Sequence, residues 1–385
     1  MLLIFLKNKK DRKIKNNYPW IFKDEIKNIE GYRKEGEICN VFSSDSQFLG
    51  KGIYSKGNIS VKMLSIKDQE IDESFFESKI LTAYKKRESL KTDSYRLIHA
   101  EADGLPGVLI DKYKEFLVIQ IRNKGMELYK NYITNALIKI LKPKGIYERS
   151  DFETTVNEDI KRNVGTIYGE TPPDEIIIQE HKINYYVDIK KGQKTGFFFD
   201  QRDSRKFLQT LTKNGDRVLD AYTYTGGFAF NAAVSGAEEV IAIDKDEHSY
   251  QTGIKNAELN KIKNVKFINT DFLKYIENYE GEKFDIIILD PPSLIKKKSE
   301  RQKGIGIFKK IIEQSAPHLK ENGIMGVCSC AYQADIDFLI EATRKAYEPL
   351  QKTIQVLGMT YQSLDHPWII QIPESLYLKC LWFRI

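Results

Sequence analysis

Short apolar runs rich in β-branched residues alternate with helical patterns along the second half of the chain. The runs are GDRVLDAYT, EVIAIDKD, VKFINTD, FDIIILDPP and GIMGVCSCA, and each ends in polar or turn residues. Between them, FAFNAAVSGA and HSYQTGIKNAELNK carry apolar residues at helical spacing. Buried strands that alternate with helices form βαβ units around a parallel sheet. We therefore predict a doubly wound α/β domain over residues 191–385, with its ligand at the carboxyl ends of the strands.

The first 190 residues follow other patterns. CNVFSSDSQFLGKGIYS and NISVKMLS alternate polar and apolar residues between glycine turns, which predicts a small β-rich module over residues 1–70. A helix is expected over 73–91, strands are expected at GVLIDKY and FLVIQIRN, and a second helix is expected over 127–142. Residues 71–190 are therefore predicted to form an α+β domain, so that the chain has three domains.

Composition narrows the class of protein. Of the 385 residues, 41% are apolar and 30% are charged, as in a folded globular protein. The opening MLLIFL is too short for a signal-peptide core, and no stretch has the roughly 18 consecutive apolar residues of a membrane span. Four cysteines make no disulfide framework, so we expect thiols in a reducing cytoplasm.

The net charge of +6 includes two strongly basic runs, KNKKDRKIKN at 7–16 and KKKSERQKGIGIFKK at 296–310. Solvated surface explains either run taken alone. Two runs, one of them beside the expected ligand site, favour an anionic polymer such as RNA as the partner. The sequence leaves open whether the chain is a monomer or a homodimer.

Acidic residues stand at the ends of the first four predicted strands. After the first strand, Gly226 and Gly227 open a helix, where glycines let a ligand approach the backbone and free N–H groups face an anion. The second acid lies where a carboxylate binds ribose hydroxyls, and the third is placed to reach an adenine amino group. This layout predicts a nucleotide-type pocket. Its four carboxylates are Asp220, Asp244, Asp271 and Asp290.

An NAD enzyme is the competing interpretation of this pocket, but YTYTGGF lacks the G-x-G-x-x-G spacing of a dinucleotide site. Any one of the acids could also be a helix N-cap or a surface charge. The whole pattern resembles class I S-adenosylmethionine (SAM)-dependent methyltransferases. In those enzymes the glycine loop receives the methionine end, and the acids after strands two and three hold ribose and adenine. The resemblance adds three expected cofactor contacts, Tyr222, Thr223 and Pro291.

Two of the four cysteines, Cys328 and Cys330, lie at the end of the fifth predicted strand. Strand alternation puts both on one side, with Cys330 at the exposed tip next to Asp290 on the neighbouring strand. A metal site would need further ligands that the sequence does not place nearby. We expect Cys328 to be a buried, inert thiol, and for Cys330 burial is the competing interpretation.

A thiol at this position suits methylation of pyrimidine carbon 5, which is a poor nucleophile. Addition of the Cys330 thiolate to carbon 6 makes carbon 5 nucleophilic toward the methyl group of SAM. A base then removes the carbon 5 hydrogen, and the thiol is expelled. Asp290 is expected to hold the flipped base at its Watson–Crick edge. Amine methyltransferases often carry an aromatic residue after DPP, and this chain has Ser293 there.

Over nearly its whole length, the chain resembles the ribosomal RNA large-subunit methyltransferase I family. The matching stretches are YPWIFKDEI, EADGLPGVLIDKY, KTGFFFDQRDSR, the cofactor motifs, LDPPS, SCA and DHPWIIQIPESLYLK. The family implies an N-terminal PUA domain that binds RNA, a central α+β domain, and a Rossmann-like methyltransferase domain with a mostly parallel seven-stranded sheet. It also implies methylation of cytosine carbon 5 in ribosomal RNA, with Cys330 as the nucleophile and Phe199 and Gln201 as cofactor contacts.

Two positions depart from the family, which often has lysine after DPP and serine after the cysteine, where this chain has Ser293 and Ala331. They leave open another target nucleotide, including uracil. His366, in DHPW, is expected to pack without a catalytic role. Two other hypotheses stay open, namely methylation of an exocyclic base amine and a non-catalytic RNA-binding protein of ribosome assembly.

Overall fold

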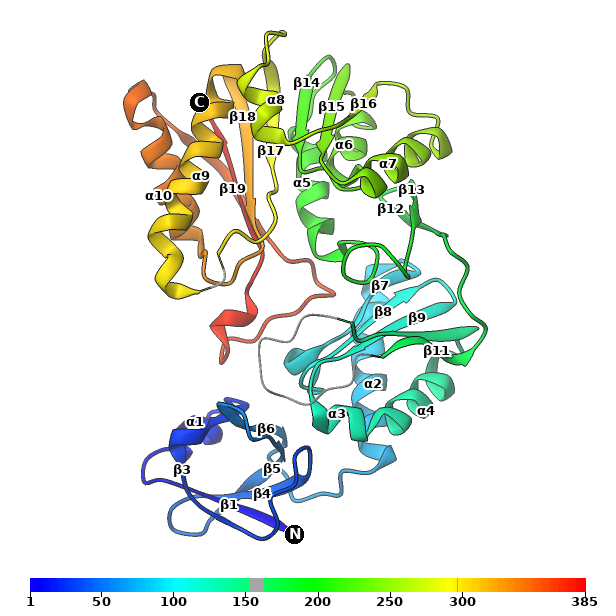
Figure 1. Cartoon of the computed structure of the whole chain (residues 1–385), viewed down its shortest axis with the longest axis vertical. Helices are drawn as coiled ribbons and strands as arrows, with labels where there is room; N and C mark the ends of the chain where they lie inside the picture. Colours follow the sequence, from blue (N-terminus) through cyan, green and yellow to red (C-terminus); the bar gives the residue numbers. More distant parts are fainter. Residues whose placement is uncertain (152–162, 296) are drawn as a thin grey trace. The chain divides into compact units, whose positions relative to one another are not determined.

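The structure is a computed structural model that describes residues 1–151, 163–295 and 297–385 (Figure 1). It comprises two units. The first takes in Met1–Ile176, Asp188–Phe197 and Leu364–Pro373, and the second takes in Ile177–Val187, Phe198–Ser363 and Glu374–Ile385. The three-domain division at residues 70 and 190 stays a prediction. Lys296, in the second basic run, lies outside the described residues.

The first unit begins with a six-stranded sheet in the order β2-β6-β5-β4-β1-β3. Three of its strands, β1, β2 and β4, alternate buried and more exposed residues, as period-2 side chains do when one face covers a core. In β1, for example, Leu2, Ile4 and Leu6 are buried. The elements are β1 (Leu2–Leu6), α1 (Asp11–Lys15), β2 (Trp20–Phe22), β3 (Ile26–Glu30), β4 (Ile38–Phe42), β5 (Phe48–Tyr54) and β6 (Ile59–Ser65). The predicted β-rich module is confirmed.

A five-stranded sheet in the order β11-β10-β9-β8-β7 follows in the same unit. Its helices pack apolar residues such as Phe76 and Ile133 into one core with the strands. The helix expected over 127–142 is split at Tyr129, so that prediction is wrong at its first turn. The elements are α2 (Glu73–Arg87), β7 (Ser94–His99), β8 (Val108–Tyr113), β9 (Phe116–Ile121), α3 (Lys124–Leu128), α4 (Lys130–Leu141), β10 (Gly145–Arg149) and β11 (Val164–Gly169).

A segment from the C-terminal part of the chain also belongs to this first unit. The Asp365 carboxylate accepts a hydrogen bond from the Arg96 backbone at 3.0 Å, and its carbonyl accepts one from Arg87 at 3.0 Å. His366 is buried, with Nδ1 2.9 Å from Asp365 Oδ1. Residues of the DHPW motif are thus held by β7 and α2.

The second unit is built on a seven-stranded sheet in the order β16-β15-β14-β17-β18-β20-β19. β14 to β18 run parallel, while β20 is antiparallel to both β18 and β19. The predicted mostly parallel seven-stranded sheet is confirmed, with all five expected strands. They are β14 (Arg217–Ala221), β15 (Glu239–Asp244), β16 (Val265–Asn269), β17 (Phe284–Leu289) and β18 (Leu319–Ser329), followed by β19 (Gln355–Tyr361) and β20 (Lys379–Arg384).

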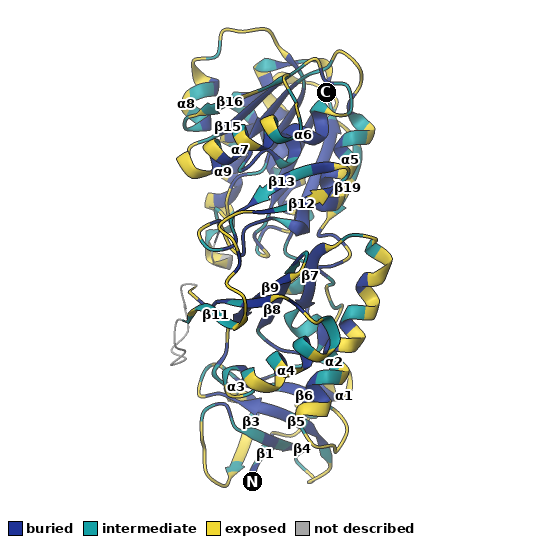
Figure 2. Ribbon diagram, turned by 90° about the vertical axis from the view of Figure 1, so that its right-hand side faces the viewer, coloured by how far each residue is buried: buried dark blue, intermediate teal, exposed yellow. Residues whose placement is uncertain are grey.

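Helices cover both faces of this sheet, and strand alternation divides its residues between two cores. On one face, Leu219 and Ile287 pack with Phe308 of α9; on the other, Val218 and Ile286 pack with residues of α5 and α6. Figure 2 shows the strands mostly buried and the outer surfaces of helices such as α7 exposed. The helices are α5 (Arg202–Leu211), α6 (Gly227–Ala233), α7 (Glu247–Leu259), α8 (Phe272–Glu277), α9 (Arg301–Ser315) and α10 (Ile336–Tyr347).

A two-stranded hairpin, β12 (Ile176–Glu180) and β13 (Ile183–Val187), precedes the large sheet. The β13 backbone donates to Asn256 and Asn260 side chains of α7 and its C-cap, at 2.7 and 2.8 Å. Within the described ranges, no helix is long and apolar enough to cross a membrane.

Candidate active site

The carboxyl ends of β14, β15 and β17 meet at one edge of the large sheet, because the three strands are parallel neighbours. Asp220 continues the side of β14 that carries Val218, and Asp290 continues the side of β17 that carries Ile286 and Ile288. Both carboxylates therefore lie on the face that α5 and α6 cover. The sequence had placed these acids at strand ends; the register now puts two of them on one face.

Asp220 is fully buried at the start of the glycine loop. Its Oδ2 accepts hydrogen bonds from Thr223 Oγ1 at 2.5 Å and from the Ala229 backbone at 2.8 Å. Oδ1 is buried and has no hydrogen-bond partner within the residues that the structure describes. Burial raises the pKa of Asp220 to about 7, with Asp290 and Asp244 adding to the rise while the two donors oppose it. This buried carboxylate oxygen can accept a hydrogen bond from a donor group of a ligand.

The backbone of the glycine loop is unusual in two ways. Tyr222 and Tyr224 adopt positive φ angles of 62° and 53°, although neither is glycine. Gly226 has a φ of 95°, and a Cβ there would lie 2.4 Å from the Phe230 ring. Only glycine fits this position without displacing the ring. At Gly227 a Cβ would meet Arg205 at 3.3 Å, so the start of α6 is also closely packed.

Asp244, at the end of β15, is half-buried and braces the same loop. Its Oδ2 accepts from the Tyr224 backbone at 2.8 Å and its Oδ1 from the Asp246 backbone at 2.9 Å. Burial raises the pKa of Asp244, although the backbone donors act against that rise. Asp271 caps α8, accepting from the Lys274 backbone at 3.2 Å. The N-cap that the sequence offered as an alternative is therefore present at Asp271, next to the Tyr222–Phe272 ring contact.

Asp290 is held by a side chain from another segment. Gln201 is buried, and its Nε2 donates to Asp290 Oδ2 at 2.9 Å. Gln201 thus braces the carboxylate beside Pro291, which is itself buried, and its expected contact with the cofactor stays a prediction. Phe199 is also buried, and its carbonyl accepts from Ser363 Oγ at 2.7 Å. The structure thus brings Gln201 and Asp290 together, whereas the ring of Phe199 packs in the interior of the unit.

A buried ion group fixes the segment that carries Phe199 and Gln201. Glu180 of β12 accepts from Arg205 at 2.6 Å and from Arg202 at 3.1 Å, and all three side chains are buried. Burial raises the pKa of Glu180, but the two guanidinium groups outweigh it, and the net pKa is lowered. Arg205 also donates to the Phe198 carbonyl at 2.9 Å. The start of α5 is therefore set by the β12–β13 hairpin.

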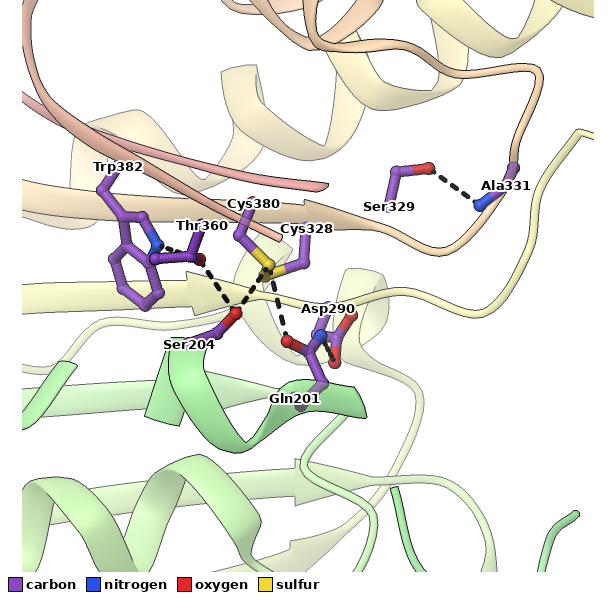
Figure 3. Close-up of a disulfide and its surroundings, with 9 residues drawn as sticks. All are labelled: Gln201, Ser204, Asp290, Cys328, Ser329, Ala331, Thr360, Cys380 and Trp382. Carbon is purple, nitrogen blue, oxygen red and sulfur yellow. Dashed lines mark hydrogen bonds between the residues drawn. A yellow bond between two sulfur atoms is a disulfide. The ribbon is translucent and has the colours of Figure 1, made fainter. Parts of the chain in front are cut away.

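The expectation of four unpaired thiols is wrong, because Cys328 and Cys380 form a disulfide. The two residues stand directly opposite each other on antiparallel strands β18 and β20, with Cα atoms 4.0 Å apart. Figure 3 shows the disulfide beside Gln201, whose Oε1 lies 3.5 Å from the Cys380 sulfur. The sequence argued correctly that Cys328 is buried but could not align β18 with a strand about 50 residues further on. The reducing compartment, which was inferred from unpaired thiols, stays a prediction.

Cys330 lies outside the disulfide, one residue past the end of β18. Its side chain is half-buried and packs against the core that contains Cys328 and Cys380, so it lies on the face of Asp220 and Asp290. The expected position at the strand tip is therefore found. The other cysteine outside the disulfide, Cys39, is fully buried in the first unit, where burial raises the pKa of its thiol to about 12.

One residue at this tip was missed from the sequence. Lys379, the first residue of β20, is buried, and its Nζ donates to the carbonyls of Ala331 at 3.3 Å and Tyr377 at 3.2 Å. Burial lowers its pKa to about 8, while Asp335 and Cys330 act in the opposite direction. The sequence feature that could have identified this residue is a lone lysine directly before the apolar stretch CLWF.

Both basic runs are partly paired with acids. In the first, Lys13 pairs with Glu25, and Lys15 lies 2.6 Å from Asp11. In the second, Arg301 lies 2.9 Å from Asp335. Fewer cationic side chains are therefore available to bind a polyanion than the sequence suggested.

Comparison with known proteins identifies matching family models, relatives and solved structures. Residues 164–358 match the family model described as S-adenosylmethionine-dependent methyltransferase, and residues 4–66 match that of a PUA-like domain. The chain is 34% identical, over 100% of its length and 99% of the relative's, to ribosomal RNA large subunit methyltransferase I of Aeromonas salmonicida. It is also 34% identical to the protein of that name from Vibrio vulnificus, over 98% of this chain and 97% of the relative.

Two solved structures share the whole fold. SMU.776, assigned as a methyltransferase and complexed with SAH, matches with a TM-score of 0.87 at 23% identity, covering 100% of both chains. A structure from Streptococcus mutans, assigned as a SAM-dependent methyltransferase, matches with a TM-score of 0.85 at 24% identity over 100% of both chains.

Proposed function

This chain belongs to the ribosomal RNA large subunit methyltransferase I family and is a SAM-dependent methyltransferase, and we propose that it methylates carbon 5 of a cytosine in large-subunit ribosomal RNA through a Cys330 adduct. The substrate rests on the names of the relatives, and the reaction rests on one observation. That observation is a half-buried cysteine at the tip of β18, on the same face as Asp290 at the tip of the neighbouring β17.

The residues at the strand tips fit SAM. The buried Oδ1 of Asp220, without a partner among the described residues, suits the ammonium of the methionine moiety. Gly226 and Gly227, where α6 begins, are assigned to the methionine end, and Asp244 is assigned to the ribose hydroxyls. The adenine is assigned to the side of Asp271. The proposed cofactor contacts are completed by Phe199, Gln201, Tyr222, Thr223 and Pro291.

Cys330 supplies the nucleophile that carbon 5 of a pyrimidine lacks. A bond forms between Cys330 Sγ and carbon 6 of the flipped base, and the electron pair of the 5,6 double bond becomes available at carbon 5. SAM, when bound, supplies the methyl group that carbon 5 takes up. A base then removes the carbon 5 proton, the bond between Sγ and carbon 6 breaks, and the double bond returns. Asp290, oriented by Gln201, holds the cytosine ring at its Watson–Crick edge throughout.

Substitution of Cys330 by serine tests this function. Cys330→Ser should abolish methyl transfer to ribosomal RNA and leave the dissociation constant for SAM within about twofold in calorimetry. Cys39→Ser, which changes a buried thiol in the first unit, is the matched control and should keep full activity. Methyl transfer retained by Cys330→Ser contradicts the covalent mechanism.

The modified nucleoside identifies the acceptor. Ribosomal RNA from a strain that lacks the gene should gain 5-methylcytidine, seen by mass analysis of its nucleosides after incubation with the enzyme. A methylated uridine or a methylated exocyclic amine would replace the cytosine assignment. Failure to bind SAM in calorimetry would instead favour an RNA-binding assembly protein without catalysis.

A further inference from the structure

A buried lysine amine at the tip of β18 is hydrogen-bonded to the residue that follows the proposed nucleophile. Lys379 is 2% exposed, and among the described residues its acceptors are the Ala331 and Tyr377 carbonyls. Ala331 directly follows Cys330, so the amine is tied to the backbone that carries the thiol. Two carbonyls occupy two of the three N–H groups of an ammonium, and the third can meet a thiolate.

The charged groups around Lys379 also favour an interaction between its amine and Cys330. Among the described residues, Asp335 and Cys330 act electrostatically on its amine. Asp335 is already engaged, because it caps α10 by accepting from the Phe338 backbone at 2.8 Å and pairs with Arg301 at 2.9 Å. Asp335 is also largely exposed to water, which screens its charge. The Cys330 sulfur is therefore the group whose charge a buried amine here can balance.

We propose that the Lys379 amine takes the proton of the Cys330 thiol and holds the resulting thiolate for attack on the base. This inference rests on the proposed function, in which Cys330 is the nucleophile. The S–H bond breaks, its electron pair stays on sulfur, and the proton moves to Nζ to give an ammonium paired with a thiolate. When the adduct collapses, the thiolate returns and the pair is restored. Lys379 is thus a positioning residue, since it acts on the base only through Cys330.

Two physical facts make the pair favourable. A neutral amine is cheaper to bury than an ammonium, which is why burial lowers the pKa of Lys379 to about 8. An unperturbed thiol ionises near pH 8.5. Once the proton has moved, each of the two charges stabilises the other. Burial of an ammonium without an anion is destabilised by the loss of water around the charge, and the nearby thiolate offsets this desolvation.

Alkylation of Cys330 by iodoacetamide measures the thiolate directly, without RNA or SAM. The full-length protein is alkylated without reductant from pH 5.5 to 9.5, and the modified peptide is quantified by mass. Cys39 is buried and Cys328 and Cys380 are in the disulfide, so Cys330 should carry the label. In the wild type, the midpoint of the rate profile should lie about one pH unit or more below the ordinary thiol value near 8.5.

Lys379→Met keeps an apolar stem and removes the amine. It should raise the midpoint by about one unit and slow alkylation at pH 7 about tenfold. Lys320→Met, at the opposite end of β18, is the matched control and should not move the midpoint. An unshifted midpoint in Lys379→Met would mean that Lys379 only ties the backbone.

The wild-type profile keeps the test decisive if Lys379→Met does not fold. A wild-type midpoint at or above 8.5 overturns the inference by itself. The alkylation profile is independent of methyl transfer, so it also separates the two proposals. A shifted midpoint together with active Cys330→Ser would retain the amine–thiolate pair and reject the covalent mechanism.

Discussion

The buried carboxylate of Asp220 leads to a prediction about how the free energy of unfolding changes with pH, and to a second one about the affinity for SAM. Asp220→Asn should preserve the fold, because the asparagine oxygen can accept the two hydrogen bonds that Oδ2 receives from Thr223 and Ala229. The amide nitrogen then takes the place of Oδ1. The substitution therefore removes a charge and an acceptor while keeping the shape of the side chain.

The size of the expected change in the free energy of unfolding follows from the pKa of Asp220. Burial raises it from 3.8 to about 7, a shift of about 3 units, or about 4 kcal/mol in all. Between about pH 4 and pH 7 the native state keeps a proton on Asp220 that the unfolded chain has lost. The free energy of unfolding therefore falls as pH rises through this window. From pH 5 to pH 8, wild type should lose about 3 kcal/mol relative to Asp220→Asn.

Urea denaturation of the ligand-free proteins at pH 5, 6, 7 and 8 gives this difference. Asp337→Asn, which changes an exposed carboxylate of α10, is the control and should run parallel to wild type. SAM titrations of the same proteins should show affinity that rises with pH up to about 7 in wild type only. Loss of a charge-assisted hydrogen bond should weaken SAM binding by Asp220→Asn about 10- to 100-fold at pH 8.

Parallel stability curves for wild type and Asp220→Asn would refute the reasoning on the buried acid. Unchanged SAM affinity in Asp220→Asn would refute the assignment of Oδ1 to the ligand's ammonium. The two results are independent, because one is read without ligand and the other from the ligand itself.

Two further predictions concern the supports of the site. Glu180→Gln should lower the free energy of unfolding by about 3–5 kcal/mol in urea, since it leaves Arg202 and Arg205 buried without their anion; a loss under about 1 kcal/mol would contradict this. Reduction of the disulfide, which spans 52 residues, should cost wild type about 4 kcal/mol, whereas Cys380→Ala should be insensitive to a thiol reductant. A reductant that leaves wild-type stability unchanged would count against the bond.

Much of the candidate site could be predicted because its signals are local. Asp220 and Asp290 each follow a run of buried residues, and a strand that ends at a polar residue can be recognised from its own neighbours. Parallel strands then bring their carboxyl ends to one edge whatever the details of packing. The position of Cys330 at the tip of the fifth strand followed from the same logic, although the side chain is half-buried there and not exposed.

Other features of the site depend on which strand lies beside which. The pairing of Cys328 with Cys380 and the burial of Lys379 both come from the antiparallel register of β18 and β20. The contact between Gln201 and Asp290 joins residues 89 positions apart. No periodic pattern contains such information, because a strand shows which of its faces is buried but not which partner buries it.

The sequence by itself therefore determined the class of fold, the strand ends and the types of chemical group that stand there, since these depend on side-chain period and on turn residues. The tertiary structure alone decided which groups become partners: a disulfide in place of two thiols, a glutamine bound to a carboxylate, and a lysine amine bound to the carbonyl of the residue after Cys330. Those pairings are set by long-range register and by the exclusion of water, which act only once distant segments have packed together.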